Sequence, residues 1–258
     1  LWSTFYGGIS GEMGFGCACD ANGNVFLTGL TNSFDFPTQN SGTFFQGSNA
    51  GGSDAFILKF DNSGNRLWAT FYGGVSQEQG SSIGVDASGK VFVCGNTSSA
   101  NFPTQNSGTF FQGALAGGTD AFVLKFDNVG NRLWATFYGG ELNDQFNALT
   151  LDNAGNLFLT GQTNSQSFPT QNASTYFQAA NAGNQESCVV KFDNVGNRLW
   201  ATYFGGNSTD SGNSIDCDSN GNVFISGVTF STNFPLLNAG TFFQATAGGG
   251  TDGYITKF

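Results

Sequence analysis

Residues 59–74 read Lys-Phe-Asp-Asn-Ser-Gly-Asn-Arg-Leu-Trp-Ala-Thr-Phe-Tyr-Gly-Gly, and this stretch decides the fold. Two apolar runs flank a polar turn that contains glycine, a pattern typical of a β-hairpin. The stretch returns at 125–140 and, with its Tyr-Phe order reversed, at 191–206. The chain starts with the second half of this hairpin and stops with the first half. We therefore predict a cyclic pattern that is opened inside one hairpin, with two ends suited to pair.

The whole sequence repeats with a period of 66 residues, without insertions or deletions. Four such units less one six-residue turn account for all 258 residues. Every tryptophan and every proline keeps one position in the repeat: Trp2, Trp68, Trp134 and Trp200; Pro37, Pro103, Pro169 and Pro235. Such periodicity indicates a repeat architecture. We predict a single domain, 1–258, with units 1–66, 67–132, 133–198 and 199–258.

Each unit contains four predicted strands and one long polar excursion. The first four of these strands cover about 14–20, 25–29, 54–60 and 67–72, the last of which opens the second unit, and the first excursion covers about 30–52. No segment shows sustained helical periodicity. Four antiparallel strands repeated around an axis describe a β-propeller blade, so we predict an all-β, four-bladed β-propeller. The first strand, rich in Gly, Ala and Ser, is expected innermost, and the strand with Trp, Phe and Tyr outermost, because blades widen outward.

Four motifs of the unit resemble the bacterial SBBP β-propeller repeat. They are Asp-x-x-Gly-Asn-Val-Phe-x-x-Gly-x-Thr at 20–31, Phe-Pro-Thr at 36–38, Asp-Ala-Phe-x-x-Lys-Phe-Asp at 54–61 and Gly-Asn-Arg-Leu-Trp-x-Thr-Phe-Tyr-Gly-Gly at 64–74. The resemblance extends over every unit of the chain. It implies a propeller of the kind found in secreted or surface proteins of bacteria, where seven blades are the rule and this chain has four units.

Three ways of completing the last blade stay open. Residues 1–8 pair with the final strand of the same chain, which removes two open sheet edges. Alternatively, residues 1–8 complete the last blade of a neighbouring molecule and build a head-to-tail filament by strand addition. In the third case the four units are a segment of a longer array.

Composition limits the function classes. The net charge is −10 and only 10% of residues are charged, whereas nucleic-acid binding needs a basic stripe, so we exclude that partner. No run of about 18 apolar residues predicts a membrane span. Residue 1 already lies in the repeat, so we expect no signal peptide in this sequence, which is a mature product or a piece of a longer chain. Together with the resemblance, this predicts an extracellular or bacterial cell-surface location.

Most of the five cysteines, Cys17, Cys19, Cys94, Cys188 and Cys217, are expected to be small core residues, because they occupy several positions of the repeat. Cys19 and Cys217 share one position, and a closed ring would make them neighbours.

No catalytic site is predicted. The chain has no histidine, which removes the usual Ser-His-Asp and Cys-His pairs and the commonest general base. Catalytic sites usually break the symmetry of a repeat, and no polar cluster is unique to one unit. We therefore predict that the protein is not an enzyme and name no catalytic or cofactor-binding residue.

Acidic residues recur at two positions of the repeat. Because the strands alternate in direction, both positions lie at the same end of the blade as the long excursion. They are Glu12, Glu78, Asp144 and Asp210 before the innermost strand, and Asp54, Asp120, Glu186 and Asp252 at the start of the third strand. Carboxylates and loop carbonyls are the hard oxygen ligands of calcium, the one cofactor we consider. In the alternative, these acids cap turns or accept hydrogen bonds from backbone amides.

Two further acidic positions lie in tight turns. Asp20, Asp86, Asp152 and Asp218 form an acidic ring about the axis or, in the interpretation we favour, cap their own turns. Asp61, Asp127 and Asp193 lie near Arg66, Arg132 and Arg198, and we expect ion pairs there. The phenylalanines of the excursion either serve sugar stacking and surface contacts or, as we favour, extend the core beneath the blade edge.

These observations predict a non-enzymatic, extracellular structural or adhesive module, a surface or filament subunit assembled by strand complementation. Its partners are further copies of itself or other surface proteins. The alternative is a propeller that binds glycans or peptides with its loop-bearing face.

Overall fold

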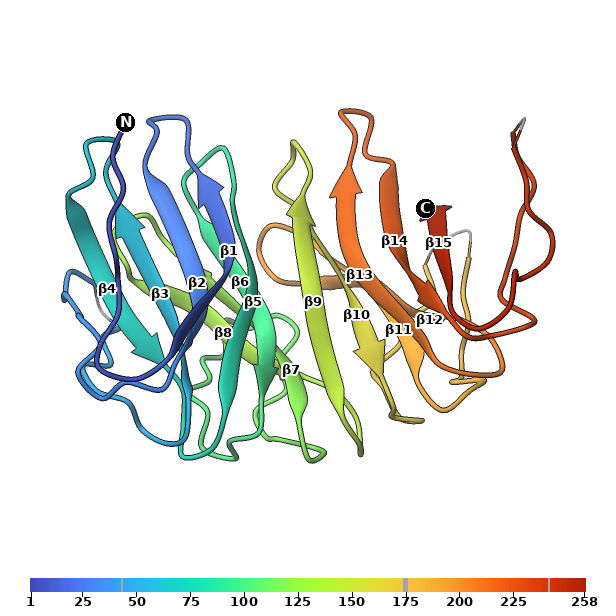
Figure 1. The fold of residues 1–258 in the computed structure, drawn as a ribbon, viewed down its shortest axis with the longest axis horizontal. Helices are drawn as coiled ribbons and strands as arrows, with labels where there is room; N and C mark the ends of the chain where they lie inside the picture. The colour runs from blue at the N-terminus through green and yellow to red at the C-terminus, as the bar shows by residue number, and fades with distance from the viewer. Residues whose placement is uncertain (43, 174–175, 241) are drawn as a thin grey trace.

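A computed structural model of the protein describes residues 1–42, 44–173, 176–240 and 242–258, and these residues form an all-β structure (Figure 1). The strands are β1 Glu12–Cys19, β2 Val25–Thr31, β3 Asp54–Phe60, β4 Arg66–Tyr72, β5 Glu78–Val85, β6 Val91–Thr97, β7 Asp120–Phe126, β8 Arg132–Tyr138, β9 Asp144–Leu151, β10 Leu157–Thr163, β11 Glu186–Phe192, β12 Arg198–Phe204, β13 Asp210–Cys217, β14 Val223–Thr229 and β15 Asp252–Lys257. The predicted strands are confirmed to within about two residues.

The strands form separate antiparallel sheets in chain order, β1 to β4, β5 to β8, β9 to β12 and β13 to β15. The first strands of successive sheets, β1, β5, β9 and β13, are neighbours and follow one another across the molecule in Figure 1. This confirms the predicted propeller arrangement of blades with the small-residue strand innermost. Domain boundaries stay a prediction, and each sheet begins about a dozen residues after its sequence unit.

Tight turns of one design close the hairpins. In the hairpin between β3 and β4, Asp61 Oδ1 accepts hydrogen bonds from the backbone amides of Ser63, at 2.9 Å, and Asn65, at 2.8 Å. Gly64 adopts a φ of 87°, which favours glycine. The same pattern holds at Asp20, Asp86, Asp127, Asp152, Asp193 and Asp218. The turn-capping interpretation of Asp20, Asp86, Asp152 and Asp218 is therefore confirmed, whereas Asp61, Asp127 and Asp193 cap turns where ion pairs were predicted.

The core is a series of apolar layers between sheets. Between the first two sheets, Trp68 of β4 stacks on Phe126 of β7 with ring centroids 6.3 Å apart, and both are buried. Equivalent layers separate the second sheet from the third and the third from the fourth. Each blade thus buries its apolar surface against the next blade along the chain.

The long excursion folds back over the outer strand of its own sheet. Gln39 and Ala69 of β4 exchange backbone hydrogen bonds of 2.8 and 3.0 Å, and Phe71 N donates to Gln46 O at 3.1 Å. Phe36, Phe102 and Phe168 are buried beneath these loops. The expectation that the excursion extends the core is borne out at these positions.

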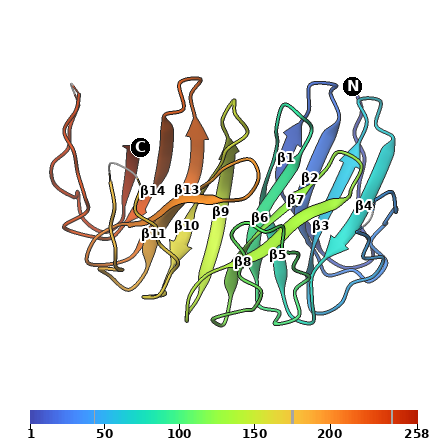
Figure 2. The same cartoon turned by 180° about the vertical axis from the view of Figure 1, so that it is seen from behind.

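The ends of the chain differ from the prediction of closure within one molecule. The last sheet has three strands, and residues 1–8 form no strand beside β15. The two termini lie at opposite ends of the molecule in both views (Figures 1 and 2). Trp2 instead packs on Phe60 of the first sheet, with ring centroids 5.5 Å apart. Residues 1–8 therefore pack on the apolar surface of the β3–β4 hairpin of the first sheet. Pairing with β15 in the same molecule would require the row of sheets to curve into a closed ring.

The cysteines are all free thiols. Cys94 and Cys188 are fully buried, as expected of core residues, whereas Cys17 and Cys19 are exposed. Because the ring is open, Cys19 on β1 and Cys217 on β13 lie in the first and last sheets rather than side by side. Within the described residues, no helix is long and apolar enough to cross a membrane.

The turn design predicts a sharp difference between two glycines. Gly155→Ala places a Cβ in a turn whose φ is 77°, with no neighbour closer than 3.4 Å, so its cost is backbone strain. We expect a loss of about 1 kcal/mol in the free energy of unfolding, measured by urea titration. Gly14→Ala, in β1 with open space around the Cβ, is the control and should cause no loss. Equal losses would contradict the assigned turn geometry.

Candidate functional site

The two recurrent acidic positions meet in pairs where one sheet joins the next. Asp54 opens β3 of the first sheet and Glu78 opens β5 of the second. The backbone amide of Glu78 donates to the carbonyl of Ser53 at 2.8 Å, which brings these strand ends together. A Cβ on Gly73 would collide with both carboxylates, so only glycine fits between them.

The pattern recurs at the other two boundaries. Asp120 and Asp144 flank Gly139 between the second and third sheets, and Glu186 and Asp210 flank Gly205 between the third and fourth. Six of the eight predicted calcium ligands are thus brought together, as three pairs. Glu12 and Asp252 are separated, because they occupy the open ends of the first and last sheets.

Backbone and side-chain donors hold each carboxylate. Glu78 accepts hydrogen bonds from the amide of Gly74 and the hydroxyl of Thr97, at 2.8 and 2.7 Å. Asp54 Oδ2 accepts from the amide of Ala50 at 3.1 Å and from Gln46 Nε2. The alternative in which these acids accept backbone amide hydrogen bonds therefore describes the structure.

Burial leaves one oxygen of several carboxylates without a hydrogen-bond partner. These atoms are Asp54 Oδ1, Asp144 Oδ1, Glu186 Oε2 and Asp210 Oδ1. Burial, together with the smaller effect of the facing acid, raises the pKa of Asp54 and of Asp120 to about 6 and that of Glu186 to about 7. A buried pair of carboxylates is costly when both are charged. Each pair accordingly takes up a proton as the pH falls through this range.

The metal prediction has a limited donor set. Within the residues that the structure describes, no group of three or more His, Cys, Asp or Glu side chains is arranged to hold a metal ion. Calcium takes six to eight oxygen ligands, so two carboxylates would need backbone carbonyls and water in addition. The amide oxygen of Gln46 is already an acceptor for Gly73 N, at 3.0 Å. Calcium binding at the acidic pairs stays a prediction.

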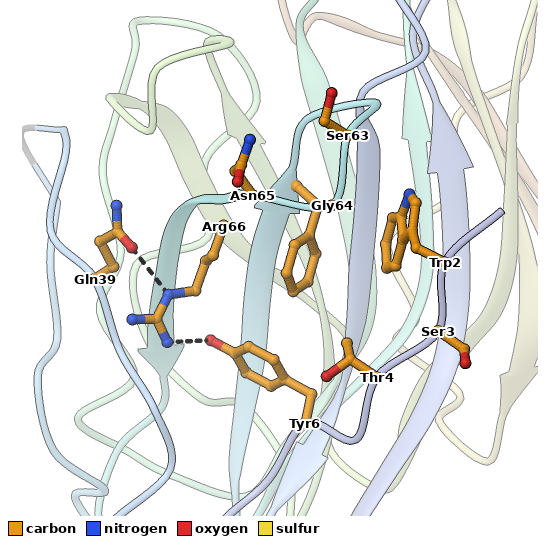
Figure 3. A pocket seen from close by; sticks show the side chains of 10 residues that line it. Trp2, Ser3, Thr4, Tyr6, Gln39, Ser63, Gly64, Asn65 and Arg66 are labelled. Atoms are coloured by element: carbon orange, nitrogen blue, oxygen red, sulfur yellow. Dashed lines mark hydrogen bonds between the residues drawn. The ribbon is translucent and has the colours of Figure 1, made fainter.

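The arginines contact neutral partners rather than the carboxylates predicted from the sequence. Arg66 donates from Nε to Gln39 Oε1 at 3.0 Å and from a terminal nitrogen to the Tyr6 hydroxyl at 2.9 Å (Figure 3). The same nitrogen donates to Pro37 O at 3.0 Å. Arg132 and Arg198 repeat these contacts. Arg132 therefore joins the outer strand of its blade to the excursion of the same blade, through Gln105 and Pro103, and to the outer strand of the preceding blade, through Tyr72. The recurrence of Gln, Tyr and Pro at constant repeat positions was the signal that could have predicted these contacts.

Two pockets accompany these features. One, of about 600 Å³, lies on the open face of the first sheet between Trp2, Tyr6, Phe60 and Arg66 (Figure 3). The other, of about 330 Å³, lies between the second and third sheets near one acidic pair and has a polar lining: Gln77, Asn96, Ser98, Thr119, Asn143, Asp144, Gln145, Gln162, Asn164 and Gln185. Sequence reasoning missed this pocket, because its lining residues come from two blades.

The repeats, the antiparallel sheets and their inner-to-outer strand order define this chain as a β-propeller repeat protein with an open row of blades. The family model described as the SBBP β-propeller repeat matches residues 133–169 and 199–235, which confirms the resemblance in those two segments.

Two curated proteins and one solved structure are similar to parts of this chain. An uncharacterized WD repeat-containing protein of Acanthamoeba polyphaga mimivirus is 25% identical over 80% of this chain and 17% of its own length. The regulatory protein FlaEY of Caulobacter vibrioides is 30% identical over 56% of this chain and 15% of its own. The chain thus spans less than a fifth of these relatives. A solved structure of a Dyadobacter fermentans protein of unknown function is 12% identical, with a TM-score of 0.42, covering 86% of this chain and 63% of that one.

The buried pairs predict a pH dependence of stability. Because the pKa values of Asp54, Asp120 and Glu186 are raised in the folded state, the stabilisation from their protonated forms is complete below about pH 4 and is lost as the pH rises through about 6 to 7. The free energy of unfolding should therefore fall between about pH 4, near the pKa values of the unfolded chain, and about pH 7, near the raised value of Glu186. Glu186→Gln should reduce this fall by on the order of 1 kcal/mol in urea titrations. Asp252→Asn, at the same repeat position on the open end, is the control, and an equal effect there would contradict the pairing.

Calcium binding predicts a different response. Millimolar calcium should raise the midpoint of thermal unfolding, and a chelator should reverse the rise. Asp144→Asn removes one carboxylate of the second pair and should diminish the response, whereas Asp152→Asn, in a turn, should leave it intact. An unchanged midpoint in calcium would reject the metal site.

Proposed function

We propose that this protein is a non-enzymatic β-propeller repeat module that binds other proteins, with a structural or adhesive role outside the bacterial cell. The apolar end of the molecule carries the proposal. Ile255 on the edge strand β15 is 79% exposed, and Leu237 and Phe242 of the preceding loop are 87% and 86% exposed. A sheet edge with apolar neighbours is suited to bind another polypeptide.

Several observations support the absence of catalysis and the extracellular location. The recurrent acids serve the boundaries between blades, and the chain contains no histidine. The WD repeat relative and the SBBP matches favour a scaffold of repeats over an enzyme. The resemblance to repeats of secreted and surface proteins supports the location.

Crosslinking on intact cells tests this proposal. A membrane-impermeant lysine crosslinker should link Lys257, on β15 at the exposed end, to other proteins in the organism that makes this chain. Lys90, in a turn of the second sheet, is the control and should be modified without being linked. Modification of both lysines only after lysis would reject the extracellular location. Equal crosslinking of both would reject the end of the molecule as the binding surface.

The polar pocket between the second and third sheets favours a second function, the binding of a neutral glycan. Amide and hydroxyl side chains line it, and the Gln185 amide donates to Gln162 Oε1 at 2.9 Å. Such groups suit the hydroxyls of a sugar, which donate and accept hydrogen bonds.

A matched pair of variants tests glycan binding. Gln145→Ala alters the pocket lining, whereas Gln79→Ala changes the same repeat position in the preceding blade, outside the pocket. A neutral oligosaccharide panel should contain a ligand whose affinity falls about tenfold in Gln145→Ala and stays unchanged in Gln79→Ala. Failure of every glycan to bind the unaltered chain would reject this second function.

A further inference from the structure

At the boundary between two blades, one aromatic side chain of the excursion fills a site made by residues of both blades. We call this side chain, Phe44 at the first boundary, the plug, and the site formed by Tyr72, Phe126 and Arg132 its receptor. Phe44, from the excursion of the first sheet, packs on Tyr72 of β4 and Phe126 of β7, with ring centroids 4.6 and 6.2 Å apart. The guanidinium of Arg132 lies 4.6 Å from the Phe44 ring centroid. The plug thus touches the outer strand of its own blade and the hairpin of the next blade.

The second boundary repeats this arrangement. Phe110 packs on Tyr138 and Phe192 at 5.0 and 5.9 Å, and Arg198 lies 4.8 Å from its ring centroid. In the third boundary, Tyr176 takes the position of the plug and contacts Phe204 and Phe258. The recurrence identifies the plug and its receptor as a standard contact between successive blades.

The first sheet carries the same receptor on its open face. Tyr6 and Phe60 lie 5.7 Å apart at 86°, as Tyr72 and Phe126 lie 5.9 Å apart at 86°. Arg66 lies over the Tyr6 ring, 5.8 Å from its centroid. The pocket of about 600 Å³ opens at this place (Figure 3). This receptor is therefore formed in advance of any partner.

The fourth plug is at the other end of the molecule. Phe242 occupies the repeat position of Phe44 and Phe110 and is 86% exposed. In the first sheet, Gln39 and Gln46 bind the loop to β4, but the last sheet contains no fourth strand to hold its loop. Figure 1 shows this loop, in red, standing away from β15.

The edge of β15 and residues 1–8 are also complementary, because each exposes apolar side chains that are buried at the equivalent positions of a complete blade. Ile255 is 79% exposed, whereas its counterparts Ile57 and Val123, each beside a fourth strand, are fully buried. Residues 1–8 have the sequence of that fourth strand, and Phe5 is 103% exposed where its counterpart Phe71 is fully buried.

We propose that two copies of this chain bind end to end, with Phe242 of one copy in the Tyr6, Phe60 and Arg66 pocket of the other and residues 1–8 of that copy paired with β15. The register of β3 with β4 specifies the pairing, in which Lys257 faces Trp2 and Tyr254 faces Phe5. The contact also brings Asp252 to Glu12, as Asp54 meets Glu78 inside the molecule. This inference rests on the proposed function, because it names the protein that is bound.

Two cysteines on the inner strands, Cys19 on β1 and Cys217 on β13, allow the contact between copies to be detected by disulfide crosslinking. Cys217 Sγ donates to the carbonyl of Leu151, at 3.2 Å, and Leu151 holds the same repeat position in the preceding sheet. Cys19 holds that position in the first sheet. End-to-end binding therefore places Cys19 of one copy beside Cys217 of the other.

Association is tested with variants of exposed residues. The unaltered chain should reach the mass of two or more copies in sedimentation equilibrium as its concentration rises. Phe242→Ala and Ile255→Lys should each weaken this association about tenfold or more. Phe243→Ala is the matched control, because its counterparts Phe45 and Phe111 remain 39% and 36% exposed beside a complete blade. Circular dichroism should confirm that all variants keep the fold.

Crosslinking distinguishes binding between copies from closure within one. In a Cys17→Ser background, mild oxidation should join Cys19 to Cys217 in a product of at least twice the mass of the chain, and Cys19→Ser should abolish it. A monomer at every concentration, or a Cys19 to Cys217 link within one chain, would overturn the inference. So would equal losses in Phe242→Ala and Phe243→Ala. A monomer whose Lys257 is still crosslinked to unrelated proteins would leave the proposed function intact.

Discussion

No sheet in this protein buries its own apolar face, so each depends on the next sheet along the chain. Trp68 and Phe126, from two successive sheets, are buried only because those sheets stack. The burial of large aromatic side chains is the main favourable contribution to the stability of such layers. The same requirement gives the first and last sheets one unsatisfied face each, which is why exposed apolar residues gather at the ends.

The blade boundaries also contain buried polar contacts that fix how one sheet meets the next. Asp54 and Glu78 face each other around Gly73, and backbone hydrogen bonds join the same strand ends. Burying two carboxylates is unfavourable, so we infer that each pair fixes the orientation of one sheet against the next rather than adding to the stability of the fold. Arg66, Gln39 and Tyr6 add hydrogen bonds at the outer side of the boundary. Alignment between blades is thus specified at both ends of the contact.

The separate sheets and the SBBP matches identify the chain as a β-propeller repeat protein. The SBBP matches and the WD repeat relative describe the architecture, and the chain spans less than a fifth of the length of its curated relatives. Function in such scaffolds resides in particular surfaces rather than in the fold. Here the distinctive surfaces are the two open ends and the polar pocket between the second and third sheets.

The sequence by itself determined the 66-residue repeat, the four strands of each unit and their order, because glycine turns and alternating apolar residues are local signals. It also indicated the turn cap at Asp20. Only the tertiary structure decided that the acids meet in pairs, that Arg66 binds Gln39 and Tyr6, and that the ends stay apart. These outcomes depend on how one blade is oriented against the next, and contacts between residues far apart in the sequence set that orientation.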